Sequence, residues 1–194
     1  MLKAAFNAVP NRNREIVHRL EHVNVVSKDQ LVQAVELGLG VSHLIAHVRN
    51  WGAAFRDYVL GQQRGQRIDP TRDDVDVGVI YSFHSDSPIS PVNPLQYVDT
   101  AAARLIDATG EVLGGEQTVS LEEAWRGVTI NPARQIGLAA EIGSLEVGKR
   151  ADFVVLGKGP RLVQPGHLHE ELEVLETWVA GWKIYRGQDV VLNT

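Results

Sequence analysis

The chain has 194 residues, 44% of them hydrophobic and 22% charged, which is ordinary for a globular protein with a sizeable core. A formal net charge of -5 with scattered arginines disfavours nucleic-acid binding, and the absence of cysteine excludes disulfides and thiolate chemistry. No apolar run reaches the roughly 18 residues that cross a bilayer, and the first residues lack a signal-peptide pattern. We therefore expect a cytoplasmic protein with no membrane span and no nucleic-acid partner.

The first part of the chain predicts strands that alternate with helices. Residues 15–23 alternate in polarity as a strand does and place His22 near its carboxyl end. A Ser-x-x-Gln capping box then opens a helix over 27–38, and a short strand follows over 39–43. Because parallel strands are joined by crossovers, usually helices, this order predicts an α/β fold with a parallel sheet.

The stretch 79–88 organises the rest of the chain. Its apolar run ends abruptly in polar residues, which predicts a buried strand that presents Asp86 to a site. Before it, residues 46–76 predict a long helical insertion followed by a charged surface loop. After it, we expect a helix over 94–108, a helix over 120–129 that begins with a Ser-x-x-Glu capping box at Ser120, and a restarted helix over 131–137.

The sequence pattern changes at residue 142 from predicted helices to turns and short strands. A turn-like stretch precedes a predicted strand over 151–156, and residues 173–185 predict a hairpin. We therefore expect two parts: an α/β body over 1–141 and a small β-sandwich segment over 142–194.

Two side chains stand at predicted carboxyl ends of strands, where (β/α) barrels place their active sites. The imidazole of His22 and the carboxylate of Asp86 are both good ligands for Zn²⁺, and Asp86 could also take a proton from a metal-activated water. The alternative is that His22 is a packed strand-end residue and Asp86 an N-cap. The pattern of the sequence leaves both interpretations open.

The remaining histidines have more ambiguous surroundings. His43 is interpreted as structural and His47 as a possible pocket residue, while His84 either lines the pocket or is a hydrogen-bonded core residue. His167 and His169 form a His-x-His pair that could bind metal, but the favoured interpretation is a solvated loop, because Pro and Gly precede the pair and acidic residues follow it.

Several short motifs, weak individually, occur together in a specific order. They are Leu20-Glu21-His22, Ser85-Asp86-Ser87-Pro88 with Pro91-Val92-Asn93-Pro94-Leu95, Glu123-Ala124 with Thr129-Ile130-Asn131-Pro132-Ala133, and the run from Gly143 to Phe153. In this order the chain resembles the amidohydrolase superfamily, in particular the branch of N-substituted formamide deformylase-like enzymes.

The resemblance implies a metal-dependent hydrolase with a distorted (β/α)₈ barrel of the TIM type and a small β-sandwich. It implies that His22 binds a divalent metal, Zn by preference, and that Asp86 binds the metal and activates water. It also favours His47 as a substrate-binding residue; His84 is the second substrate-binding candidate. The substrate would be a small molecule with an amide-like carbon–nitrogen bond outside a peptide.

The family's remaining metal ligands are absent, because the motifs cover only the last three βα units of the barrel. We therefore expect an N-terminally incomplete chain that is inactive alone and requires a complementary N-terminal half or an oligomer. The alternative function is that of a catalytically inactive barrel remnant that binds a partner or oligomerises.

Overall fold

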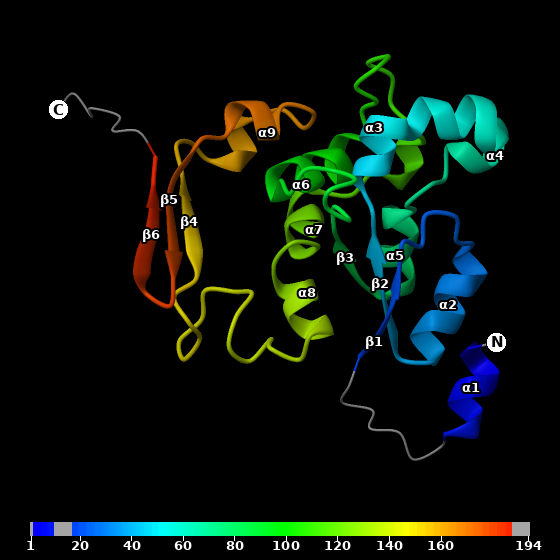
Figure 1. The fold of residues 1–194 in the computed structure, drawn as a ribbon, viewed down its shortest axis with the longest axis horizontal. Coiled ribbons are helices and arrows are strands. Elements are labelled where there is room, and N and C mark those ends of the chain that lie inside the picture. Colours follow the sequence, from blue (N-terminus) through cyan, green and yellow to red (C-terminus); the bar gives the residue numbers. More distant parts are fainter. Residues whose placement is uncertain (1, 10–16, 188–194) are drawn as a thin grey trace.

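The computed structural model describes residues 2–9 and 17–187 and contains two separate sheets (Figure 1). The first is a parallel sheet in the order β1-β2-β3. Its strands are β1 (His18–Glu21), β2 (Leu39–His43) and β3 (Ile80–Phe83). The predicted α/β fold and parallel sheet are confirmed, although the strands that precede His22 and Asp86 are shorter than the sequence indicated.

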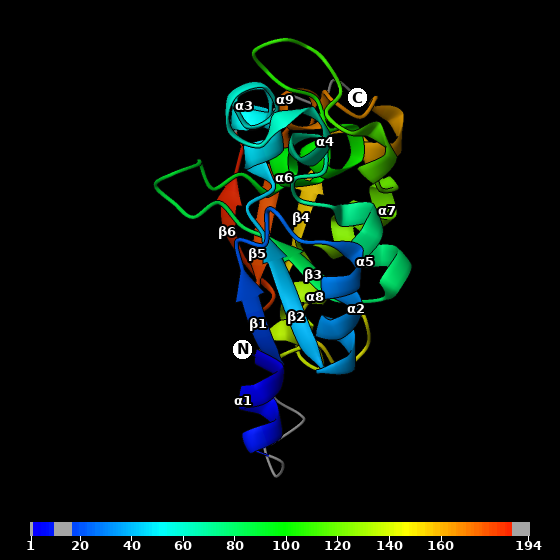
Figure 2. The same ribbon diagram turned by 90° about the vertical axis from the view of Figure 1, so that its right-hand side faces the viewer.

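Helices form both crossovers between these strands. The first crossover is α2 (Lys28–Glu36), which begins with the predicted capping box of Ser27 and Gln30. Together with α5, it covers one side of the sheet (Figure 2). The second crossover contains α3 (Ala46–Ala54), the π-helix η1 (Phe55–Val59), α4 (Gly61–Gly65) and α5 (Thr71–Val77).

The charged part of this second crossover was expected to be a surface loop, and that expectation is wrong. Ile68 is fully buried there, and Asp69 and Asp74 are buried against His43. The segment is mostly helical, and these contacts fix its second half, from Ile68 to Asp74, to the core, while residues 61–64 are exposed.

Between β3 and residue 135 the regular elements are short helices, separated by loops over 84–93 and 104–114. These elements are α6 (Pro94–Ala103), the 3₁₀-helix η2 (Gly115–Gln117), α7 (Leu121–Arg126) and α8 (Ile130–Gln135). The helix predicted over 94–108 ends early, because Arg104 adopts a left-handed φ of 52° and turns its guanidinium into the core. At the other end of the described chain lies α1 (Leu2–Ala8). No helix among residues 2–9 and 17–187 is long and apolar enough to span a membrane.

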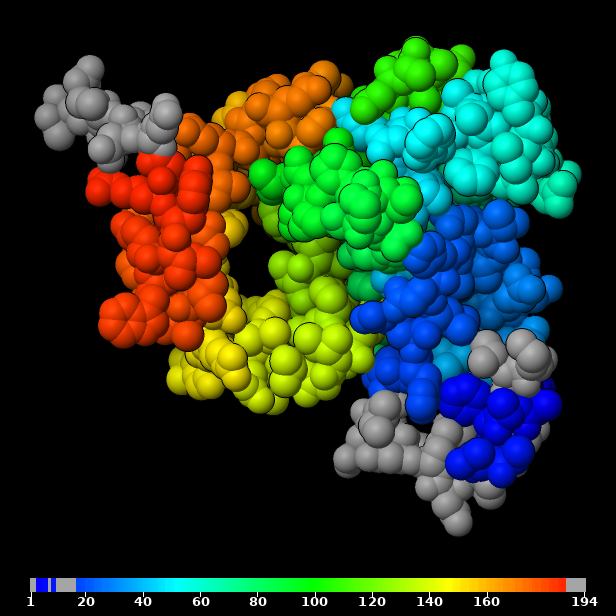
Figure 3. Space-filling model, viewed as in Figure 1, coloured from blue at the N-terminus to red at the C-terminus, as the bar shows by residue number. Residues whose placement is uncertain are grey.

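The second sheet is antiparallel and lies apart from the first. It contains β4 (Phe153–Leu156), β5 (Val174–Val179) and β6 (Trp182–Arg186), with the short helices η3 (Pro160–Leu162) and α9 (Leu168–Glu171) between β4 and β5. Figure 3 shows a hollow between this sheet and the helical body. A second layer that would complete a sandwich is not found in the described part of the chain, and the boundary at residue 142 stays a prediction.

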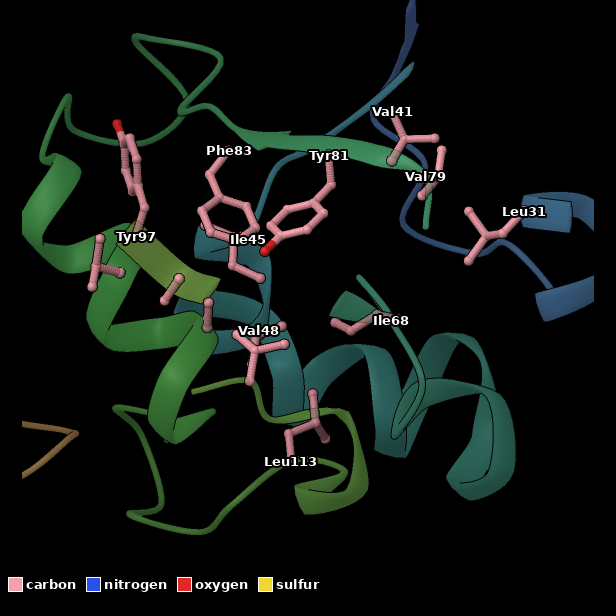
Figure 4. Packing of buried hydrophobic residues seen from close by; sticks show 14 of the residues in the cluster. Leu31, Val41, Ile45, Val48, Ile68, Val79, Tyr81, Phe83, Tyr97 and Leu113 are labelled. Atoms are coloured by element: carbon pink, nitrogen blue, oxygen red, sulfur yellow. The ribbon is translucent and has the colours of Figure 1, made fainter. Parts of the chain in front are cut away.

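The main core lies on one face of the parallel sheet (Figure 4). Tyr81 and Phe83 lie beside Ile45 there, and Val41 lies beside Val79 in the same cluster. The opposite face carries small residues, and Gln135 of α8 approaches so closely that a Cβ on Gly40 would lie 3.0 Å from its Nε2. The strands are thus held from both faces, which fixes where their carboxyl ends lie.

Candidate functional site

The carboxyl ends of the three parallel strands lie at one edge of the sheet, where the candidate residues gather. The backbone N–H of His22, just after β1, donates to the carbonyl of Ser42 at 2.9 Å. The backbone N–H of His84, just after β3, donates to the carbonyl of His43 at 3.0 Å. These bonds extend the sheet by one residue on each side of β2 and bring residues from distant parts of the chain together.

His22 and Asp86 form the centre of the site. Their Nε2 and Oδ1 atoms are 3.8 Å apart, beyond hydrogen-bond distance, and their side chains are 45% and 46% exposed. Both residues have positive φ angles, 58° and 50°, which are uncommon outside glycine and occur often at functional sites. Nε2 of His22 and Oδ1 of Asp86, two potential metal-ligand atoms, therefore lie close together on side chains that reach solvent.

His84 lies beside His22, with 4.7 Å between the ring centroids. Its Nε2 is buried and has no hydrogen-bond partner among the described residues. Burial, reinforced by nearby His22, lowers the pKa of His84 from its ordinary value, so the ring is neutral at pH 7. The structure therefore places His84 at the site, while its proposed role in substrate binding stays a prediction.

His47 lies at the same edge and is oriented by Asn24. The Asn24 side-chain amide donates to Nδ1 of His47 at 3.0 Å and to both carboxylate oxygens of Asp69 at 2.9 and 3.1 Å. Burial lowers the pKa of His47, although the negative charge of Asp69 acts in the opposite direction. The lowered pKa favours a neutral ring. Sequence reasoning missed both Asn24 and Asp69; the only local signal was that Asn24 follows His22 by two residues.

His43 is structural, as its sequence context indicated. The ring is fully buried between two carboxylates, with Nδ1 3.2 Å from Asp69 and Nε2 2.7 Å from Asp74. Burial alone would lower the pKa of His43, but the charge of Asp74 and the bonds to both carboxylates outweigh it and raise the pKa to about 10. His43 is therefore an imidazolium at neutral pH and holds Asp69 in the position where it meets Asn24.

The raised pKa of His43 predicts that stability falls at alkaline pH. The unfolded-state value is 6.5 and the folded value about 10, so the contribution is complete below pH 6.5 and is lost as pH rises through 10. We expect the free energy of unfolding to fall by on the order of 5 kcal/mol over this window. Urea titrations at a series of pH values measure the fall, and an NMR titration of the His43 ring checks its source. A His43 ring that titrates near pH 6.5 would contradict the assignment.

The solvated-loop interpretation of the His-x-His pair is wrong for His169. This side chain is only 13% exposed, and its Nδ1 lies 2.7 Å from the carboxylate of Asp99, which is itself buried. His167 is half exposed and contacts Glu170. His169 joins α9 to α6 through Asp99, whereas His167 precedes α9 and its side chain contacts that helix, so a metal site here is not supported.

The described donors fit only part of a metal site. His22 and Asp86 offer one nitrogen and one oxygen ligand to the same space, but no group of three or more His, Asp or Glu side chains that could hold an ion occurs in residues 2–9 and 17–187. A catalytic zinc ion ordinarily has three protein ligands. The pair could therefore contribute to a cation site only together with groups from elsewhere.

Comparisons with known proteins agree with this geometry. A model of the amidohydrolase family matches residues 1–185. The chain is 35% identical over 178 residues to the N-substituted formamide deformylase of Arthrobacter pascens, which covers 91% of this chain and 32% of the relative. It is 26% identical to the putative amidohydrolase YtcJ of Bacillus subtilis, over 86% of this chain and 32% of the relative.

Solved structures give the same result. An uncharacterised metal-dependent hydrolase of Pyrococcus horikoshii superposes with a TM-score of 0.68 at 26% identity, over 87% of this chain and 34% of that one. An adenosine deaminase of Xanthomonas campestris with bound zinc shares the fold, with a TM-score of 0.64 at 19% identity, over 93% of this chain and 39% of that one. The chain thus spans about a third of the length of these relatives.

Proposed function

The chain belongs to the amidohydrolase family, and from this premise we propose that it supplies the last three βα units of a metal-dependent (β/α)₈ barrel. The barrel would hydrolyse a non-peptide carbon–nitrogen bond in a small amide-like substrate. The parallel order β1-β2-β3 and the gathering of polar side chains at the strand ends support this assignment. We assign β4, β5 and β6 to the small β-sandwich segment of such an enzyme, beginning at residue 142.

The observation that carries the proposal is the convergence of His22 and Asp86. The two residues are 64 positions apart in sequence, yet their ligand atoms face the same space at 3.8 Å. They would hold a divalent cation. One nitrogen ligand from His22 and one oxygen ligand from Asp86 suit Zn²⁺. When bound, such a cation polarises a carbonyl group and lowers the pKa of water.

The chemistry assigned to the chain's own residues is proton transfer and orientation. The Asp86 carboxylate accepts a proton from the water that attacks the amide carbonyl carbon, and the same proton passes to the nitrogen as the carbon–nitrogen bond breaks. A carboxylic acid and an amine are thereby formed. We assign substrate contact to His47, which Asn24 holds, and to His84, whose buried Nε2 makes no hydrogen bond among the described residues and lies 3.9 Å from the carboxylate of Glu21.

The missing ligands and strands would come from a complementary polypeptide segment that lies against β1. Among the described residues β1 pairs with β2 alone, which leaves its other edge open, and three of its four residues are exposed. A depression of about 760 Å³ beside it is lined by apolar residues such as Leu20, Val23 and Val26. A preceding strand and helix of the barrel would cover both features.

Reconstitution tests this function. We expect this chain, co-expressed with the first two thirds of the Arthrobacter pascens relative, to form a complex that retains zinc and hydrolyses simple N-substituted amides. His22→Ala should weaken the zinc affinity of the complex about 100-fold or more, because a direct ligand is lost. Mass spectrometry should then find less zinc in the variant complex. The exposed His167→Ala is the matched control and should retain zinc. A soluble complex that binds no divalent metal would contradict the assignment of His22 and Asp86 as metal ligands.

A second candidate function, a non-catalytic binding module, is favoured by the exposed apolar residues of β6. Trp182 and Ile184 are 77% and 65% exposed on a strand that pairs, within the described part of the chain, with β5 alone. If binding through this sheet is the function, His22→Ala and Asp86→Ala should leave association unchanged in analytical ultracentrifugation, and zinc should not raise the melting temperature. Replacement of Trp182 by Ser should then weaken association.

A further inference from the structure

An apolar stripe runs along the helical segment that follows β2. His47, Trp51, Phe55 and Val59 are spaced four residues apart across α3 and η1, so they share one face, with Ala54 beside them. Trp51 is 52% exposed and Val59 63% exposed, an unusual exposure for large apolar residues in such a row. Trp51 and Val59 therefore face solvent, whereas Phe55 between them is partly buried against the core and His47 belongs to the candidate site.

This stripe forms one wall of a pocket of about 250 Å³, and Ile89 forms the opposite wall. His47 is the single polar side chain that lines the pocket. An apolar cavity of about 150 Å³ accommodates benzene, whereas pockets for whole small-molecule ligands measure roughly 300–1,000 Å³. The volume therefore suits one ring and its attachment atoms and is too small for a complete substrate.

The pocket adjoins the candidate site on two sides. The backbone N–H of Ile89 donates to the carbonyl of Asp86 at 2.9 Å, so a single turn carries both the carboxylate and the apolar wall. On the other side, the ring of His47 packs against Phe55 with 5.4 Å between centroids. A group in the pocket would lie next to the space that His22 and Asp86 face.

We propose that this pocket binds a flat apolar group, one ring in size, attached to the carbon–nitrogen bond of the substrate. The identity of the reacting bond rests on the proposed function, whereas binding of the ring does not. The pocket would prefer amides that carry an aryl group over amides that carry only a small alkyl group. A competing occupant is a polypeptide segment that covers Trp51.

Binding to the chain alone tests the proposal without requiring catalysis. The probes are N-phenylacetamide and N-methylacetamide, and the readout is the indole N–H signal of Trp51 in NMR spectra of ¹⁵N-labelled protein, assigned with Trp51→Phe. We expect N-phenylacetamide to shift this signal saturably and N-methylacetamide to leave it in place. The indole of the exposed Trp182 is the internal control for nonspecific contact with aryl groups.

Two variants locate the binding. Ala54→Leu fills the pocket and should weaken N-phenylacetamide binding at least tenfold, while Ile89→Ser removes an exposed apolar wall without disturbing the core and should also weaken it. Val35→Leu, on the exposed face of α2, is the control. Equal effects of the two amides on Trp51, or undiminished binding in both pocket variants, would overturn the proposal. So would a Trp51 signal that responds only to protein concentration, as in self-association.

The reconstituted enzyme separates this proposal from the proposed function. If N-phenylacetamide binds at Trp51 but no amide is hydrolysed, the pocket stands and the hydrolase assignment fails. If both amides are hydrolysed with equal kcat/KM, the hydrolase assignment stands and the pocket proposal fails. If both hold, Ala54→Leu should lower the ratio of kcat/KM for the phenyl over the methyl amide, and Val35→Leu should leave that ratio unchanged.

Discussion

Replacing Arg104 with Leu is expected to lower the free energy of unfolding by about 4 kcal/mol. The side chain is fully buried, and its guanidinium donates to the carbonyl oxygens of Leu113 and Ile68 at 2.7 Å and of Asp69 at 3.0 Å. Burial lowers the pKa of Arg104 to about 10, so it remains charged at neutral pH. The substitution would leave the carbonyls of Leu113 and Ile68 without this donor, whereas the Asp69 carbonyl keeps its bond from the backbone N–H of Thr71. Each unsatisfied buried group costs about 1–3 kcal/mol.

Urea unfolding followed by circular dichroism measures this loss. Arg104→Lys keeps a positive charge but lacks the planar fork that reaches several acceptors, so an intermediate loss is expected. Arg126→Leu is the matched control, because Arg126 is exposed and pairs only with Glu122 one turn away; its loss should stay within about 0.5 kcal/mol. A loss below about 1 kcal/mol for Arg104→Leu would show that solvent reaches the freed carbonyls.

Arg104 also illustrates which parts of the fold the sequence could predict. The capping boxes at Ser27 and Ser120 were correct, since both interacting groups lie within one helical turn. The existence of β1 and β3 was predicted for a similar reason, because alternating polarity and an apolar run that changes abruptly to polar residues are local signals, although both strands are shorter than predicted. The end of α6 was placed too late, because it depends on distant carbonyls that Arg104 meets only in the folded chain.

The candidate site shows the same difference between features with a local sequence signal and features set by contacts between distant residues. His22 and Asp86 could be proposed from their positions after predicted strands, but the contact between Asn24 and Asp69 joins residues 45 positions apart. No local pattern distinguishes Asp69 from the other acidic residues of its segment. The error over His169 has the same origin, because its partner Asp99 lies 70 residues earlier in the chain. Pairings of this kind are set by packing and not by propensity.

Asp86→Asn is expected to lower kcat/KM for amide hydrolysis by about 10³-fold in the reconstituted enzyme. A general base contributes roughly 10²–10⁴-fold to a rate, and the amide that replaces the carboxylate cannot accept the proton. Asp86 is half exposed and Asn has nearly the same shape and tolerates the left-handed backbone, so the free energy of unfolding should change by less than about 0.5 kcal/mol. Loss of activity without loss of stability is therefore the expected signature of a catalytic carboxylate.

Asp69→Asn is the informative counterpart, because Asp69 is buried in the same region but belongs to the structural network. It removes one of the two charges beside the imidazolium of His43, so it should lower stability by about 3 kcal/mol or more. Asp29→Asn, on the exposed first turn of α2, controls for the loss of a negative charge. It should change neither kcat/KM nor the free energy of unfolding. If Asp86→Asn retained full activity at unchanged stability, the proton acceptor would have to be another group, and the convergence of His22 and Asp86 would then serve binding alone.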